Sequence, residues 1–404
     1  MKRASRLGAL ETAPARPARR ELDSAMQRER QAALRYRPVR KRAGYLPALD
    51  GWRAVAILGV ILTHDSLHAI GPFSTLWVFQ NGKNGVDLFF AISGLLICWR
   101  LLEEEQFFGR ISLRNFYIRR AFRILPPALA FLVAVAILGL TGVLHIGVRE
   151  WLVSLFFLRN YTSLVGQQAP DSYFTSHFWS LAVEEHFYLI LPALLVLTRK
   201  RWRLGVLIGL SVVVAAHRFQ VLESRPWEHV LFHTDIRLDA LLIPAILAVL
   251  AQSSKVREKL AAGLRIWPLL SIALLFLVSH WEGAWLQITL VALLMPLMVL
   301  GSVLNPRGYL TMALEWAPLR YLGRISYSLY LWQELFFTGH YYHGFPLGIL
   351  ERTPLRYIAL LAIAVASYHF LERPLIELGH RLAPPATPGR DDIPDELPGI
   401  QAAP

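Results

Sequence analysis

The sequence predicts an all-α polytopic membrane protein with about ten transmembrane helices and both termini in the cytoplasm. Of its 404 residues, 54% are hydrophobic and 18% are charged. Apolar runs about as long as a membrane-spanning helix recur along most of the chain, which is typical of proteins that cross a bilayer repeatedly. The connecting loops alternate between basic loops and loops nearly free of Lys and Arg, and this alternation sets the predicted orientation.

The apolar runs define the predicted spans in order. They cover residues 52–70, 85–102, 125–145, 178–198, 203–219, 236–252, 266–280, 284–303, 321–338 and 354–371. The basic loops that we place inside are residues 99–123, 199–203, 253–265 and 305–320. Between the third and fourth spans, Trp151 to Leu158 is apolar but too short to cross. We therefore predict an interfacial or re-entrant helix there.

The net charge of +13 comes mostly from one end of the chain. Residues 1–44 contain thirteen Lys or Arg against four Asp or Glu, and we predict a disordered basic cytoplasmic tail beside acidic lipid, with no nucleic-acid partner. Residues 45–376 form the predicted membrane domain, and residues 377–404 are a predicted polar, Pro-rich cytoplasmic tail. The one cysteine, Cys98, excludes an intramolecular disulfide and a thiol metal cluster.

The first span carries two ionisable side chains in helical phase. Arg53 and His64 are eleven residues apart, which on a helix brings both to one face, about 16 Å apart along the axis. Ionisable groups at such positions are costly and usually functional. Asp65 adjoins His64 but points about 100° away from it, so the sequence favours a carboxylate from another helix as the partner of His64.

Three further spans place polar side chains toward the same outer side. Span two begins with Asn84-Gly85-Val86-Asp87 and carries Ser93 and Gly94, small residues that permit close helix approach. Span four has a polar stripe at helical spacing, and span six opens with Arg237 between two carboxylates with which it is expected to pair. The stripe comprises His177, Ser180, Glu184 and Tyr188, and the two carboxylates are Asp235 and Asp239. These spans predict one polar cavity built by several helices.

On the inner side, Arg119, Arg120 and Arg123 precede the third span. Guanidinium groups suit phosphate, so these residues are candidates for a phosphate site. Ordinary positive-inside anchoring explains them equally well.

Together these segments resemble the acyltransferase-3 family of integral membrane acyltransferases, from about Tyr45 to Pro374. The resemblance rests on five motifs in order: Arg53-x10-His64, Gly85-Val-Asp87-Leu-Phe-Phe-Ala-Ile-Ser93-Gly94, Arg119-Arg120-Ala-Phe-Arg123-Ile-Leu-Pro126, Phe178-Trp179-Ser180-Leu-Ala-Val-Glu184-Glu185 and Leu322-Gly323-Arg-Ile-Ser326-Tyr327-Ser-Leu-Tyr330-Leu-Trp332. The chain departs from the family pattern at His186, where Gln is frequent, and at Gln333, where His is frequent. Many relatives carry a periplasmic esterase-like domain after the last span, and none is expected here.

The resemblance implies an enzyme of the cell inner (plasma) membrane that acylates, most often acetylates, a sugar hydroxyl in a surface polysaccharide, lipopolysaccharide or related glycan. It implies acetyl-CoA or another acyl-CoA as co-substrate, a glycan or glycolipid acceptor and no metal. The phosphates of the acyl-CoA would lie near Arg53, Arg119, Arg120 and Arg123. The residues expected to contact the acceptor are Trp179, Ser180, Arg237 and Asp239.

The resemblance places His64 at the reaction centre. The residues favour Asp87 or Glu184, from other helices, as its catalytic partners, and an interhelical contact explains Asp87 equally well. Imidazole suits either of two roles, as general base on the acceptor hydroxyl or as the nucleophile that carries the acyl group, and the sequence leaves both open. Two other functions remain alternatives. A secondary transporter would also need a polar path through the helices, although no inverted repeat is visible. A non-catalytic scaffold is the other alternative.

Overall fold

The computed structural model describes residues 46–66, 82, 84–161, 170–224, 230–278, 284–337 and 346–384, and all regular structure within these ranges is helical. The first half comprises α2 (Pro47–Ser66), α4 (Asn84–Phe108), α5 (Leu113–Leu140), α6 (Val148–Leu155), η3 (Pro170–Thr175), α7 (Phe178–Leu197) and α8 (Lys200–Ser224). The second half comprises α9 (Thr234–Arg237), α10 (Asp239–Leu250), α11 (Ser254–Gly263), α12 (Trp267–Val278), α13 (Ala284–Leu304), α14 (Tyr309–Leu314), α15 (Ala317–Arg324), α16 (Ser326–Trp332), η5 (Gln333–Leu335), η7 (Gly348–Glu351), α17 (Leu355–Ser367), the π-turn η8 (Tyr368–Glu372) and α18 (Arg373–Leu382).

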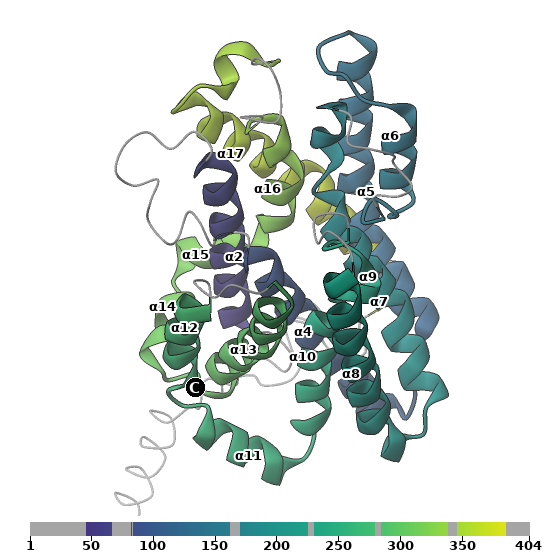
Figure 1. The fold of residues 1–404 in the computed structure, drawn as a ribbon, viewed down its shortest axis with the longest axis vertical. Coiled ribbons are helices and arrows are strands. Elements are labelled where there is room, and N and C mark those ends of the chain that lie inside the picture. The colour runs from purple at the N-terminus through teal and green to yellow at the C-terminus, as the bar shows by residue number, and fades with distance from the viewer. Residues whose placement is uncertain are drawn as a thin grey trace, which may run out of the picture. The chain divides into compact units, whose positions relative to one another are not determined.

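Helix α4 lies at the centre of the packing. It contacts α2, α7, α10 and α13, while α2 also packs against α15 and α5 packs against α18 (Figure 1). Most residues of α4 are buried, and its apolar side chains continue the main core cluster. Because α4 is apolar nearly all round, it belongs inside a bundle rather than at its edge.

Glycine allows two of these contacts. A Cβ atom at Gly94 would overlap the carbonyl oxygen of Leu241 on α10, and one at Gly85 would overlap the carbonyl oxygen of Ala56 on α2. The close helix approach predicted at Ser93-Gly94 is thus confirmed, since only a residue without a side chain fits there. These contacts fix the positions of α2, α4 and α10, which carry several of the candidate site residues.

Six helical segments within the described residues are long and apolar enough to cross a membrane: Asn84–Phe108, Leu113–Leu140, Tyr173–Leu197, Lys200–Glu223, Trp285–Leu304 and Leu355–Leu382. A seventh follows if α10 and α11, which meet at 118°, are counted as one broken span. The predicted count of ten is not confirmed. Several predicted spans correspond to shorter pieces, because α12 has 12 residues and the helix of the ninth predicted span breaks between α15 and α16.

Other segments also differ from, or lie beyond, the predictions. The apolar stretch from Trp151 to Leu158 falls mainly in α6, an eight-residue helix that is short as predicted. The predicted basic tail lies outside the described residues. Of the predicted C-terminal tail, residues 377–382 continue α18 and residues beyond 384 lie outside the described ranges.

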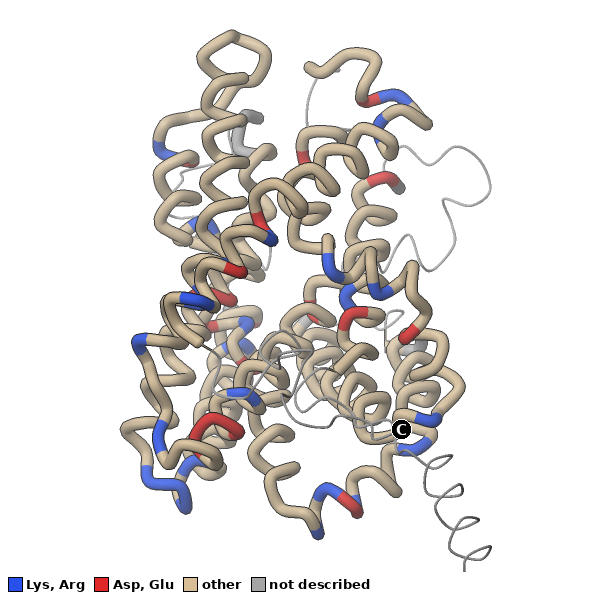
Figure 2. The backbone as a smooth tube through the Cα atoms, turned by 180° about the vertical axis from the view of Figure 1, so that it is seen from behind, with Lys and Arg blue, Asp and Glu red and all other residues tan. Residues whose placement is uncertain are grey.

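Charged residues occur within the helical body as well as at helix ends. Figure 2 shows Lys, Arg, Asp and Glu segments gathered at mid-height as well as in the lower part of the molecule. Buried charges inside a membrane protein are retained when they are paired or line a polar site. The contacts of each charged side chain show whether it is paired or lines a polar site.

Candidate functional site

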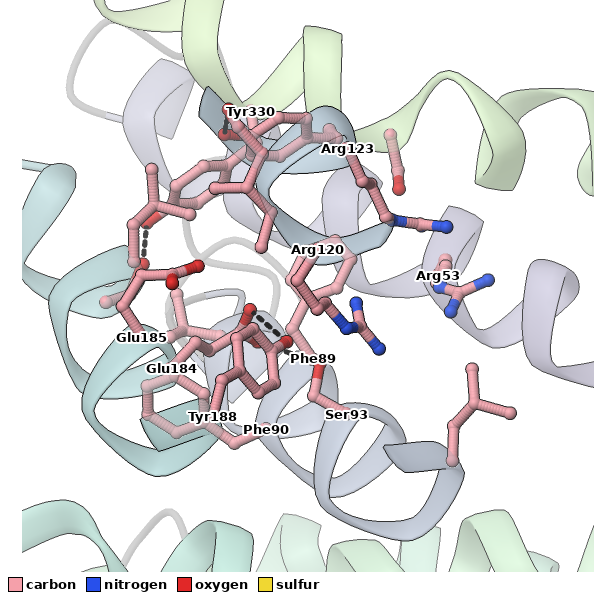
Figure 3. Close-up of a pocket in the computed structure, with 17 residues that line it drawn as sticks. Arg53, Phe89, Phe90, Ser93, Arg120, Arg123, Glu184, Glu185, Tyr188 and Tyr330 are labelled. Carbon is pink, nitrogen blue, oxygen red and sulfur yellow. Dashed lines mark hydrogen bonds between the residues drawn. The ribbon is translucent and has the colours of Figure 1, made fainter. Parts of the chain in front are cut away.

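A cavity lies among the five helices α2, α4, α5, α7 and α16. Its polar wall carries three guanidinium groups, two carboxylates and several hydroxyl groups, and its apolar wall is largely aromatic. The residues that line it are Arg53, Val86, Phe89, Phe90, Ser93, Leu96, Arg120, Arg123, Ile124, Ser180, Leu181, Glu184, Glu185, Tyr188, Ser326, Tyr327 and Tyr330. Figure 3 shows the three Arg side chains gathered on one side, across from Glu184 and Glu185.

The three arginines reach the cavity from two helices. Arg120 and Arg123 lie one turn apart on α5, and Arg53 comes from the second turn of α2. Arg53 forms an ion pair with Asp50 at 2.9 Å, and the Arg120 guanidinium lies 4.7 Å from the centre of the Tyr188 ring. Among the described residues, neither Arg120 nor Arg123 forms an ion pair with a carboxylate within 4.0 Å. Two half-buried guanidinium groups are therefore available to an anion.

Glu184 is held at the opposite wall by two hydroxyl groups. Ser93 of α4 donates to its Oε1 atom at 2.9 Å, and Tyr188, one turn further along α7, donates to Oε2 at 2.9 Å. Of the predicted stripe, Ser180, Glu184 and Tyr188 thus lie along one cavity wall, whereas His177 does not line the cavity. Glu185 also lines the cavity, although a helix separates adjacent side chains by about 100°.

Ser180 and Tyr330 connect this cavity to a second cluster. Their hydroxyl oxygens are 2.5 Å apart, and both hydroxyls contact the main-chain carbonyl of His177, at 3.2 Å and 3.0 Å respectively. His177 immediately precedes α7, and its ring packs between Phe131, Phe178 and Tyr330. Two hydroxyl groups of the cavity wall are therefore in contact with a buried histidine.

His64 lies near the C-terminal end of α2 and does not line the cavity. Its Nδ1 atom is 2.8 Å from the carbonyl oxygen of Val60, and its Nε2 atom is 3.4 Å from Oε1 of Glu334. The same carboxyl oxygen is 3.9 Å from Nδ1 of His177. The carboxylate beside His64 is thus Glu334, whereas the sequence favoured Asp87 or Glu184.

Asp87 and two predicted acceptor residues form a separate group. Arg237 donates to Asp87 at 2.5 Å, and its guanidinium lies 5.8 Å from the Trp179 ring centre. Trp179 also packs against Phe90 and Phe232. The expected pairing of Arg237 with Asp235 or Asp239 was wrong, because the carboxylate it meets comes from α4.

Asp239 and Arg119 also have partners away from the cavity. Asp239 accepts from both terminal nitrogens of Arg218 on α8, at 2.8 Å and 2.7 Å, and this pair is almost fully buried. Arg119 donates to Glu104 at 3.4 Å and to the carbonyl oxygens of Ala383 and Pro384. The structure thus brings Arg53, Arg120 and Arg123 together but leaves Arg119 outside the cavity.

Sequence reasoning missed Glu334 and Arg218. Glu334 follows Gln333 directly after the Tyr330-Leu-Trp332 motif, inside the predicted span 321–338. A carboxylate within a predicted membrane span could have been recognised from the sequence as a candidate functional residue. Among the described residues, no group of three or more His, Cys, Asp or Glu side chains is arranged to hold a metal ion.

Comparison with known proteins gives consistent matches. Residues 46–368 match the family described as the acyltransferase domain. The chain is 31% identical over 368 residues to "Putative peptidoglycan O-acetyltransferase YrhL" of Bacillus subtilis, covering 83% of this chain and 56% of that protein. It is 29% identical over 373 residues to "O-acetyltransferase OatA" of Staphylococcus aureus, covering 83% of this chain and 58% of that protein.

A further Staphylococcus aureus protein, named as a putative O-acetyltransferase, is 30% identical over 371 residues, which cover 84% of this chain and 58% of the relative. The chain therefore spans a little more than half the length of these curated relatives. No solved structure matches the chain.

Proposed function

The chain belongs to the acyltransferase-3 family of membrane O-acetyltransferases, and from that premise we propose that it moves an acyl group, most often acetyl, from cytoplasmic acyl-CoA to a sugar hydroxyl. The proposed acceptor is a surface polysaccharide, lipopolysaccharide or related glycan at the inner membrane. A relative whose name specifies peptidoglycan supports a glycan acceptor.

The observation that carries the proposal is the arginine wall of the cavity. Arg120 and Arg123 are half-buried without a carboxylate partner within 4.0 Å, and Arg53 lies beside them. A guanidinium group partly removed from water is stabilised by an opposite charge, and the phosphates of acyl-CoA would supply that negative charge through charge-assisted hydrogen bonds. The aromatic and aliphatic remainder of the wall suits the less polar part of such a donor.

We assign the acyl-transfer step to His64. His64 lies outside the donor cavity, whereas Ser180 and Tyr330 line it and contact the main-chain carbonyl of His177. In the proposed route, the thioester end of the donor extends beyond Ser180 and Tyr330 to reach His64. His64 then acts on the acceptor hydroxyl as general base or carries the acyl group itself. Asp87, Arg237 and Asp239 are assigned to ion pairs that hold the helices, and Glu184 is assigned to the donor cavity.

The experiment measures donor binding and thioester cleavage by the purified full chain in lipid nanodiscs. Radiolabelled acetyl-CoA is titrated, competed with free CoA, and followed by the release of CoA thiol. We expect saturable binding that weakens with salt, because phosphate contacts are electrostatic. Replacement of both Arg120 and Arg123 by Ala should abolish it. Absence of saturable binding by the folded wild-type chain would contradict the proposal.

A further inference from the structure

Glu334 presents one carboxyl oxygen to two imidazole rings from different parts of the chain. Its Oε1 atom lies 3.4 Å from Nε2 of His64 on α2 and 3.9 Å from Nδ1 of His177 before α7. The Glu334 side chain is 1% exposed and that of His177 is 2% exposed, whereas 28% of the His64 side chain is exposed. The carboxylate is therefore shielded from water, while His64 remains accessible to a substrate.

Each ring nitrogen of His64 faces an oxygen atom, the Val60 carbonyl at Nδ1 and a Glu334 carboxyl oxygen at Nε2. A carbonyl oxygen only accepts hydrogen bonds, so Nδ1 of His64 must donate to the Val60 carbonyl. In the neutral ring, Nε2 then carries a lone pair, and an ionised carboxylate opposite it is unfavourable. When Nε2 is protonated, both ring nitrogens are donors and each faces an acceptor: the Val60 carbonyl and Glu334.

Both routes left open for His64 put a positive charge on its ring, and in the general-base route the added proton is on Nε2. As general base, Nε2 takes the proton of the acceptor hydroxyl while the hydroxyl oxygen bonds to the thioester carbonyl carbon and the carbon–sulfur bond breaks. The proton then passes to the departing CoA thiolate. As nucleophile, Nε2 bonds to the carbonyl carbon, and the ring stays charged until the acceptor oxygen takes the acyl group and its proton neutralises the thiolate.

We propose that Glu334 is a positioning residue that orients His64 and stabilises its charged form during acyl transfer, an inference that rests on the proposed function. A fixed carboxylate in a dry site stabilises a developing charge far better than water does. The titratable groups around Glu334 are His64 of α2, His177 before α7, Tyr173 of η3 and Tyr330 of α16. Of these, His64 is the one whose charge the reaction changes.

The test compares Glu334→Gln with the wild-type chain in nanodiscs, using acetyl-CoA as donor, a membrane glycolipid fraction as acceptor and CoA thiol release as the readout. The amide keeps the size of the side chain and removes its charge. We expect kcat to fall about 100-fold, as when one preorganised electrostatic partner is removed. The KM for acetyl-CoA should stay unchanged, since Glu334 does not line the arginine cavity.

A pH profile separates this role from a structural one. Without the carboxylate, His64 binds its proton less tightly, so the acid limb of the rate profile should move to lower pH in Glu334→Gln. The matched control is Glu351→Gln, which removes another buried carboxylate. Glu351 is the last residue of η7 and accepts from the main-chain nitrogen of Leu347, which precedes that helix. The control should leave the acid limb where it is in the wild type.

The possible results separate the role of Glu334 from the proposed function of the chain. If Glu334→Gln fails to fold, Glu334→Asp is measured instead, because it keeps the charge but withdraws it from His64, and it should lose part of kcat. A folded Gln variant with the wild-type kcat and profile, or an Asp variant with the wild-type kcat, overturns the role of Glu334 alone. A wild-type chain that neither binds nor cleaves acetyl-CoA overturns the proposed function and this inference with it.

Discussion

Asp87 of α4 and Arg237 of α9 form a buried ion pair in which the nearest oxygen and nitrogen are 2.5 Å apart, although 150 residues separate them in the chain. The Arg237 guanidinium also lies against the Trp179 ring. This arrangement joins α4, α7 and α9 at one point. A residue expected to be catalytic and two expected to bind acceptor therefore form a single structural unit.

The pair predicts a stability effect for Asp87→Asn. Removing one partner of a buried ion pair leaves the other charge uncompensated, which costs about 3–5 kcal/mol. We expect a large fall in the thermal unfolding midpoint of the detergent-solubilised protein, with donor affinity retained in the fraction that remains folded. A variant with wild-type stability and a lost kcat would instead make Asp87 the catalytic partner that the sequence favoured.

The arginines of α5 predict a contrast between neighbours. Arg123→Ala should weaken acetyl-CoA binding by about 10- to 100-fold, since a hydrogen bond to a charged group contributes about 1.5–3 kcal/mol. Arg119→Ala is the matched control, because Arg119 donates to Glu104 and to Ala383 outside the cavity. Titrations at low and high salt measure both. Equal losses of acetyl-CoA affinity in the two variants would contradict the proposal that the donor binds in the cavity, which only Arg123 of the two lines.

Glu184→Gln distinguishes two roles for Glu184, as a residue that only lines the cavity or as a catalytic carboxylate. The amide oxygen still accepts a hydrogen bond from Ser93 or Tyr188, but one negative charge facing the phosphate site is gone. We expect acetyl-CoA to bind a few-fold more tightly, corresponding to about 1 kcal/mol, with kcat nearly unchanged. A loss in kcat of about 100-fold or more, the size of a general acid or base contribution, would restore Glu184 to the catalytic role.

The sequence predicted which residues share a helix face in the site, but it did not predict which residues of different helices contact each other. Helical phase placed Ser180, Glu184 and Tyr188 on one face of span four, and they line one wall of the cavity. Phase within one helix says nothing about which distant helix lies opposite. The partner of Arg237 was therefore sought among its neighbours Asp235 and Asp239, while the actual partner is Asp87.

The same limit explains the carboxylate beside His64. Glu334 lies in η5, directly after α16, and its approach to α2 depends on how α15 and α16 break and turn. Hydropathy treats that region as one continuous span, 321–338, and so hides the break. The count of ten spans has the same weakness, because short and broken helices read as full spans when only apolar content is considered.

His64→Ala tests the central claim most directly. Purified wild-type and variant chains in lipid nanodiscs are given radiolabelled acetyl-CoA and a membrane glycolipid fraction, and the label recovered in that fraction is measured. We expect transfer by the wild type, a loss of about 100-fold or more in the variant, and equal donor affinity for both, since His64 lies outside the donor cavity. A folded, membrane-embedded His64→Ala chain that transfers label at the wild-type rate would contradict it.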